Sequence, residues 1–276
     1  MDMSAVYNAG ADSPKDALAQ EMFDQGLQWG GKRSFVYPKM KKYVFTYKGD
    51  LAIINLEKGL AGWNNAFDFL KKLVSEGKTV MFLSTQPAGR DPLARFAKEI
   101  SAPYMTTRWL GGTLTNFQTF KARLAYLKEL EEKTVSQDFQ KYTKKEQGEI
   151  MHEIQDIREK FDGLVGMNAL PDALFVFCGK RHRVALQEAE RKNIPVIGVF
   201  GLEDNPDKAA YPIVLNDTSR RSVEFVMGKV KQVYDTYRTA EKMSVHPGQE
   251  ETTEDKEPKR RAAVKERTAG EKRRAA

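Results

Sequence analysis

The run from Arg108 to Phe117, RWLGGTLTNF, carries the residue types best suited to binding an anion. Arg108 offers a planar fork of donors and Trp109 a flat stacking surface, the two tools that proteins use on phosphates and unpaired bases. The glycine pair that follows allows a sharp turn, and a helix beginning after it would present unpaired N–H groups. The polar side chains at that helix start are Thr113, Thr115 and Asn116. The run therefore predicts an anion-binding helix start. An ordinary turn around a buried Trp109 is the alternative.

A second cationic segment lies near the N-terminus. It contains no acid, Phe35 and Tyr37 are interleaved with its cations, and Pro38 forbids a continuous helix through it. We expect an extended or looped basic surface. The predicted phosphate-binding residues of this segment are Lys32, Arg33, Lys39, Lys41 and Lys42.

A third, smaller cationic patch follows a predicted strand, at residues 180–183. Each cationic segment alone is ordinarily a solvated surface, but their recurrence beside strand ends and turns points to a broad anionic partner. RNA fits because aromatic residues accompany the cations. The further RNA-contacting residues that we predict are Arg108, Trp109, Thr113, Asn116, Lys180, Arg181 and Arg183.

The chain lacks the motifs of common catalytic sites. No G-x-G-x-x-G follows a strand, and there is no Walker A sequence. His152-Glu153 begins like a zinc-protease motif, but Asp156 stands where the second histidine is needed. Cys178 ends an apolar run, where an inert packed thiol is expected. We therefore expect no catalytic residues, no metal, no cofactor and no small-molecule substrate.

Composition restricts the class of protein. The chain has 276 residues, 41% of them hydrophobic, which suffices for a proper core, and its net charge of +7 favours an anionic partner. Its single cysteine fits a reducing compartment. The first residues do not resemble a signal peptide, and no apolar run approaches the roughly 18 residues that a membrane span needs. We expect a cytoplasmic protein without a membrane partner.

Short apolar runs alternate with amphipathic helices over much of the chain. This alternation predicts an α/β fold with a parallel sheet covered by helices on both faces, preceded by a hairpin of strands 43–47 and 51–56. The predicted sheet strands are residues 79–84, 104–109, 173–177, 196–200 and 213–215. The predicted helices are residues 58–76, 92–100, 184–192 and 218–242.

Two further helices break the alternation. Apolar residues recur at spacings of three and four after Asn116 and again after Thr143, and Thr143 with Glu146 forms a capping box. Each helix has a narrow apolar stripe, so the two would satisfy each other as an antiparallel hairpin, or coiled coil, projecting from the body. The stripe is either the core of this hairpin or a groove for a partner protein.

These patterns divide the chain into four parts. Residues 1–17 form a flexible arm, residues 18–116 and 162–243 the RNA-binding body, residues 117–161 the hairpin, and residues 244–276 a charged, disordered tail. Residues 258–276 hold eight Lys or Arg and two Glu, so the tail is either simply solvated or adds phosphate contacts.

Five motifs in order resemble the small-subunit ribosomal protein S2 family in its bacterial form. They are YPKMKKYVF (37–45), RWLGGTLTNF (108–117), MNALPDALFVF (167–177), NIPVIGVF (193–200) and YPIVLNDTSRRS (211–222), and the likeness runs from about Phe23 to about Tyr237. The resemblance implies a flavodoxin-like sheet with a protruding helical hairpin, no catalysis, and a structural place in the small subunit. It also implies binding to small-subunit ribosomal RNA and to neighbouring ribosomal proteins, with ribosomal protein S1 as a candidate.

The chain departs from the family pattern at several strand ends and turns. Gln28-Trp29-Gly30-Gly31 stands where the family usually has His-Phe-Gly-His, and Val36-Tyr37 where it has Trp-Asn. Cys178-Gly179 replaces Asp-Pro, His182 replaces a Glu, and Gly201-Leu202-Glu203 replaces Asp-Thr-Asn. Contacts made by those family imidazoles and acids are therefore not carried over to this chain.

Two other classes of function compete with the structural role. A nucleotide-dependent enzyme could use the same α/β sheet, and a protein-binding adaptor could use the helical hairpin. The first would bind a nucleotide saturably, whereas the second would lose its partner when the hairpin is removed.

Overall fold

The computed structural model describes residues 14–136, 139 and 141–244. Most of the arm predicted at residues 1–17, and almost all of the tail predicted at residues 244–276, lie outside the described residues. The chain divides into two units, Met1–Ala240 and Glu241–Ala276. Every element below belongs to the first unit, apart from the last residues of the C-terminal helix.

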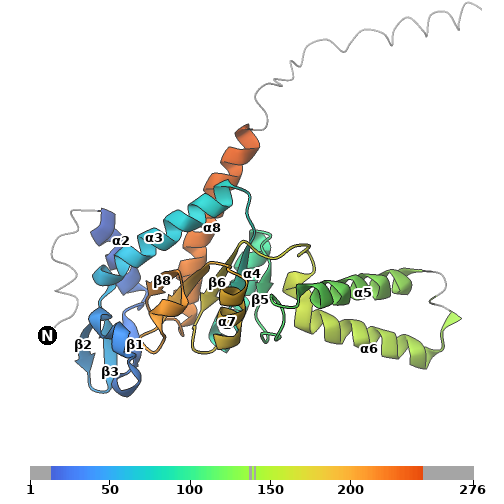
Figure 1. Ribbon diagram of the computed structural model, residues 1–276, viewed down its shortest axis with the longest axis horizontal. Helices are drawn as coiled ribbons and strands as arrows, with labels where there is room; N and C mark the ends of the chain where they lie inside the picture. The colour runs from blue at the N-terminus through green and yellow to red at the C-terminus, as the bar shows by residue number, and fades with distance from the viewer. Residues whose placement is uncertain (1–13, 137–138, 140, 245–276) are drawn as a thin grey trace, which may run out of the picture. The chain divides into compact units, whose positions relative to one another are not determined.

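A five-stranded parallel sheet forms the centre of the first unit (Figure 1). Its spatial order is β5-β4-β6-β7-β8, which becomes 2-1-3-4-5 when the strands are renumbered along the chain. That order is typical of doubly wound, flavodoxin-like sheets, so the predicted α/β class is confirmed. The strands are β4 (Val80–Leu83), β5 (Tyr104–Met105), β6 (Ala173–Phe177), β7 (Val196–Phe200) and β8 (Tyr211–Val214).

The central strands are buried along their whole length. Every residue of β4, β6 and β7 is buried, as expected where both faces of a sheet are covered. Phe82 and Phe175 pair in register across β4 and β6, with ring centroids 5.3 Å apart. The strand predicted at residues 104–109 is much shorter, because the chain leaves the sheet after Met105.

A separate three-stranded antiparallel sheet precedes the parallel one, in the order β1-β3-β2. The strands are β1 (Trp29–Lys32), β2 (Val44–Lys48) and β3 (Leu51–Ile54). The predicted hairpin of β2 and β3 is confirmed, and Gly49 occupies its turn with a φ of +60°. The sequence did not indicate β1, in which two glycines interrupt any alternation of apolar and polar residues.

We predicted that the basic segment between β1 and β2 would be extended or looped, and it is not extended. It contains two short 3-10 helices, η1 (Arg33–Phe35) and η2 (Pro38–Tyr43). Pro38 is the first residue of η2, where its missing N–H would be unpaired in any case. Met40 anchors the segment because its side chain is fully buried.

Helix α3 (Leu56–Ser75) covers the free edge of the parallel sheet. Asn55 caps its first turn by accepting from the Lys58 amide. A Cβ added at Gly62 would lie only 2.5 Å from the carbonyl oxygen of Pro212, so the helix backbone lies directly against strand β8. An exposed strand edge invites pairing with other chains, and this helix prevents it.

Four more helices complete this part of the chain: α2 (Pro14–Asp24), α4 (Pro87–Glu99), α7 (Arg183–Arg191) and α8 (Arg220–Ser244). Helix α2 lies partly in the predicted arm, and α4 begins five residues before its predicted start at Pro92. Pro87 is well placed in the first turn of α4. Across the described residues, no helix is both long and apolar enough to cross a membrane.

Helices α5 (Phe117–Val135) and α6 (Lys144–Phe161) run antiparallel beside each other (Figure 1). Leu127, Leu130, Ile154 and Ile157 form a buried cluster between them. Near the sheet, the rings of Phe120 and Phe161 meet edge to face at 5.2 Å. The predicted capping box is present: the Glu146 carboxylate accepts from the Thr143 amide at 2.8 Å, and the Glu146 amide donates to the Thr143 hydroxyl.

Candidate nucleic-acid interface

The carboxylate of Glu188 occupies the turn at residues 109–115, just before α5 begins at Phe117. Glu188 lies on α7, yet its Oε1 accepts from the Trp109 indole N–H at 3.0 Å and from the Gly112 amide at 2.9 Å. Its Oε2 accepts from the amides of Leu114 and Thr115 and from the Thr115 hydroxyl. Five donors from one short run therefore converge on a single buried carboxylate.

The turn binds an anion through N–H groups, and that anion belongs to the chain itself, which fits the alternative of an ordinary turn around Trp109. An external anion at the start of α5 stays a prediction. Burial on its own would raise the pKa of Glu188, and the hydrogen bonds outweigh it, so the pKa lies below its ordinary value of 4.5. Glu188 therefore stays ionised and fixes the turn to α7.

The predicted contact residues of this run have different surroundings. Arg108 and Asn116 are exposed. Thr113 is buried and its hydroxyl donates to the Leu110 carbonyl at 2.6 Å, so the structure speaks against Thr113 as an RNA contact. Trp109 is half-buried against the core, and its only polar atom is committed to Glu188. Packing therefore accounts for Trp109 without RNA.

The basic segment at residues 32–42 lies against the loop that follows β7. The Tyr37 amide donates to the Leu202 carbonyl at 2.8 Å, which fixes the segment in place. All five predicted cations of the segment are exposed. It is acid-free along the sequence but not in space, because Lys39 pairs with Asp207 of η5 (Pro206–Lys208). This hydrogen bond is the main cause that raises the pKa of Lys39.

The structure brings the third cationic patch to the same surface. A pocket of about 310 Å³ is lined by Tyr37 of the basic segment together with Lys180 and Arg183. Lys180 Nζ lies 5.4 Å from the centre of the Phe35 ring and 3.1 Å from a Glu203 carboxylate oxygen. Residues of two segments about 140 positions apart in sequence thus lie around one pocket. We call the predicted cations of these two segments the basic surface: Lys32, Arg33, Lys39, Lys41, Lys42, Lys180, Arg181 and Arg183.

His182 is the member of the third patch that does not reach the surface. It is buried, with Nδ1 at 2.9 Å from the Cys178 carbonyl and Nε2 at 3.2 Å from the Thr85 amide nitrogen. A carbonyl can only accept and an amide can only donate, so these partners assign the proton to Nδ1. Burial lowers the pKa of His182, which leaves the imidazole neutral. His182 therefore links the loops after β4 and β6 and adds no cation to the basic surface.

Two acids at the strand ends were not indicated by the sequence reading. Asp204 and Asp217 are buried near Cys178, and one ligand atom from each of these three residues lies within 4.8 Å of the others. Asp204 accepts from the Gly179 and Gly201 amides at 3.3 and 3.2 Å and from the Lys180 amide. The carboxyl ends of parallel strands bring such loops together, and sequence spacing alone does not reveal it.

Burial favours the protonated form of each of these three groups. Burial, reinforced by the charge of Asp204, raises the pKa of Asp217 to about 7. Burial likewise raises the pKa of the Cys178 thiol to about 12. Their spacing would admit a small cation, but a cation would have to displace these protons. No metal is needed to account for this cluster.

Two of the departures from the family pattern have a packing reason. A Cβ at Gly31 would lie 2.4 Å from a Glu203 carboxylate oxygen, and a Cβ at Gly201 would lie 2.5 Å from an Asp217 oxygen. Either position would need its neighbours to move before it could take a side chain. Gln28 is buried, and its Oε1 has no hydrogen-bond partner among the described residues.

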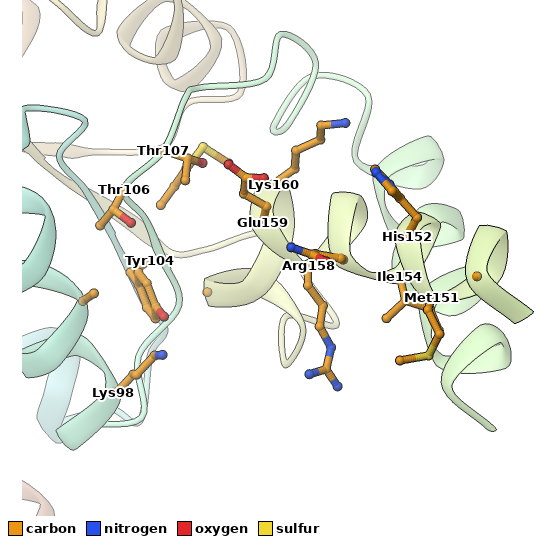
Figure 2. A pocket seen from close by; sticks show the side chains of 15 residues that line it. Lys98, Tyr104, Thr106, Thr107, Met151, His152, Ile154, Arg158, Glu159 and Lys160 are labelled. Carbon is orange, nitrogen blue, oxygen red and sulfur yellow. The ribbon is translucent and has the colours of Figure 1, made fainter. Parts of the chain in front are cut away.

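A groove of about 860 Å³ lies between α6 and the segment from α4 to β5 (Figure 2). Lys98 and Tyr104 line one side, and Met151, His152, Arg158 and Lys160 of α6 line the other. Met151 is largely exposed. The sequence did not predict this groove, because it depends on how the helix pair lies beside β5.

Replacing Glu188 with Gln tests the internal anion. The variant keeps one acceptor but places an amide NH₂ among donors, so we expect the free energy of unfolding to fall by about 2–4 kcal/mol at pH 7. Urea denaturation measures the loss. Glu190→Gln, on the exposed side of α7, is the control and should cost less than about 0.5 kcal/mol. The loss should shrink in acid, as Glu188 itself becomes protonated. Equal stability of the two variants at pH 7 would contradict this assignment.

Replacing Asp217 with Asn tests the buried acids. The folded-state pKa of about 7 lies above the ordinary value of 3.8, so the folded chain binds the proton more tightly. The stability that protonated Asp217 contributes is fully present below about pH 4 and is lost as the pH rises through 7. Asp217→Asn should flatten this decline and raise the unfolding free energy at pH 8 by roughly 2–4 kcal/mol. Urea denaturation at a series of pH values checks this, with exposed Asp207→Asn as the control. A wild-type curve that stays flat from pH 5 to 8 would refute it.

Comparison with known proteins gives the chain its family. The profile described as Ribosomal protein S2 matches residues 22–236. The small ribosomal subunit protein uS2 of Dictyoglomus thermophilum is 35% identical over 213 residues, covering 77% of this chain and 87% of the relative. That of Chloroflexus aurantiacus is 33% identical over 217 residues, covering 79% and 91%. The matched region spans both sheets, the basic surface and the helix pair, and the chain belongs to the ribosomal protein S2 family.

Proposed function

We propose that this protein is a structural constituent of the small ribosomal subunit and that it binds small-subunit ribosomal RNA through the basic surface. Membership of the ribosomal protein S2 family supports the structural role and sets aside the alternative of a nucleotide-dependent enzyme. It acts in the cytoplasm, on the ribosome. The observation that supports the RNA contact is that Tyr37, from the basic segment, lines one pocket together with Lys180 and Arg183.

The basic surface suits a phosphate backbone better than a small ligand. Its cations are exposed and spread over two segments, so they can each meet a different phosphate. Lys39 and Lys180 are paired with Asp207 and Glu203, but exposed ion pairs of this kind contribute little and can exchange for phosphate. Arg108 and Asn116 are further exposed candidates, whereas buried Thr113 is left out of the proposal and Trp109 is assigned to packing.

The helix pair gives a second, protein-binding role a specific basis. We propose that α5 and α6 form a coiled-coil hairpin, residues 117–161, inserted in the RNA-binding body of residues 18–116 and 162–243. The groove beside α6 offers exposed Met151 among cations, which suits a neighbouring ribosomal protein, with ribosomal protein S1 as the candidate. The proposed arm and tail would add contacts from outside this body.

Sedimentation of a cell lysate tests the structural role. The tagged full chain should travel with small subunits, because the basic surface anchors it to ribosomal RNA. A chain lacking residues 118–160 should remain in that peak but carry less ribosomal protein S1. Full-length protein confined to the top of the gradient would overturn the assignment.

Salt dependence tests the basic surface. Replacing Lys39, Lys41 and Lys42 with Gln removes up to three phosphate contacts, so the slope of log affinity against log salt should fall by about 2–3. Filter binding to purified small-subunit RNA measures both slopes. The matched control replaces Lys128, Lys144 and Lys145 of the helix pair and should change the slope by less than about one. Equal slopes for the two triple variants would remove this surface from the proposal.

A further inference from the structure

The three-stranded sheet leaves an aromatic outer face uncovered. Of the ten large hydrophobic side chains that are exposed among the described residues, five lie between positions 29 and 51: Trp29, Phe35, Phe45, Tyr47 and Leu51. Four of these five are aromatic. Phe35 lies on η1, and Tyr47 pairs with buried Ala52 and so faces the other side of the sheet, which leaves Trp29, Phe45 and Leu51 for the outer face. Single exposed apolar residues are ordinarily scattered, so this grouping indicates a binding surface.

Strand register assigns several of these residues to the same face. Trp29 pairs with Ile53, while Lys32 and Lys48 both pair with Leu51 from opposite sides. Laterally paired residues and residues two apart on a strand share a face of a sheet. The outer face therefore has Trp29 and Lys32 on β1, Leu51 and Ile53 on β3, and Lys48 on β2.

Two β-bulges complete this face. On β2, the register shift leaves Phe45 beside Thr46 opposite Ile53. On β1, the register shift falls at Gly30 and Gly31, which lie against the inner side of the sheet. A Cβ added at Gly30 would lie 2.7 Å from a Leu202 methyl, and one added at Gly31 would lie 2.4 Å from a Glu203 oxygen. The inner side thus packs closely on the loop after β7, and the opposite side, with Trp29 and Phe45 flanking β3, stays open.

The exposed rings of this face and the charges near them indicate which kind of ligand it would bind. Trp29 is 37% exposed, Phe45 42% and Leu51 43%, whereas Ile53 beneath them is fully buried. Lys48 Nζ lies 5.8 Å from the centre of the Trp29 ring. Residues 29–54 contain six Lys or Arg and one acid, Asp50. Flat rings beside lysines complement a polyanion that carries flat, unpaired bases.

We propose that this outer face binds unpaired nucleotides of RNA, with bases stacked on Trp29 and Phe45 and phosphates held by Lys32 and Lys48. The two rings lie on strands that flank β3, so they are about 10 Å apart and would take separate bases. Bases inside a duplex are not available for stacking, so the face discriminates single-stranded from double-stranded RNA. This inference rests on the proposed RNA-binding function and adds the kind of RNA that is bound.

Substitutions that remove the ring but keep apolar volume test the stacking. In the full chain, Trp29→Leu should weaken binding of a labelled oligouridine about 5- to 100-fold, because stacking on an aromatic side chain contributes that much for each base. Binding of a short RNA duplex should change less than about two-fold. Phe45→Leu should act in the same direction. Tyr142→Leu removes an equally exposed aromatic residue from the helix connection and should change neither affinity.

A rescue variant separates stacking from misfolding. Trp29→Phe keeps a ring and should recover most of the oligouridine affinity, and urea denaturation should show similar stability for both variants of Trp29. Fluorescence anisotropy measures binding, and photocrosslinking with 5-iodouridine should label Trp29 or Phe45.

Several outcomes would overturn the inference while leaving the ribosomal role intact. One such outcome is that Trp29→Leu and the wild type bind oligouridine with equal affinity. Another is that Trp29→Leu loses as much affinity for the RNA duplex as for oligouridine. Unchanged RNA binding with loss of Trp29→Leu from the small-subunit peak would instead indicate a protein occupant. Wild-type protein that binds neither RNA and does not sediment with small subunits would refute the proposed function itself.

Discussion

The arrangement of the site depends on the hydrogen bonds between the Glu188 carboxylate and the turn at residues 109–115. A helix start and a glycine turn leave several N–H groups without partners, and burying them unpaired would cost free energy for each group. One carboxylate from α7 satisfies five donors at once. The same bonds hold α7 to the turn that precedes α5.

Two cations of the basic surface are likewise paired with acids of the chain itself. Lys39 and Lys180 are each held by an acid from the loops after β7, Asp207 and Glu203. These pairs are exposed, so they add little stability, but they keep two long side chains near the pocket lined by Tyr37. Exchange of a carboxylate for a phosphate would then cost little. Cations that are oriented but weakly paired are suited to an RNA backbone.

The carboxyl ends of the strands carry a different chemistry from the one expected. Departures from the family pattern at Cys178, His182 and Gly201 first indicated a site stripped of its acids. The structure instead packs Asp204 and Asp217 beside Cys178, with protonation that burial favours, and buries a neutral His182 nearby. These groups bind the loops to one another beside a small pocket of about 150 Å³, which Cys178, Asp204 and Asp217 help to line.

Periodicity determined much of the fold directly from the sequence. The strands at residues 173–177 and 196–200 and the capping box at Thr143 follow from local patterns, because burial on both faces and helix capping are local constraints. The five motifs likewise pointed to the family. Strand β1, the start of α4 at Pro87 and the short β5 could not be predicted, because pairing and packing with distant segments decide them.

The site divides in the same way. Residue types alone indicated that the run at residues 108–117 binds an anion and that residues 32–42 form a basic surface. Only the tertiary structure decided that the anion is Glu188, that Thr113 is buried, and that residues 180–183 join the basic surface. It also decided that Trp29 and Phe45 share an open face, since strand register sets which side chains face outward. The physical reason is that a sequence specifies what each residue can bind, whereas the fold specifies which partner is within reach.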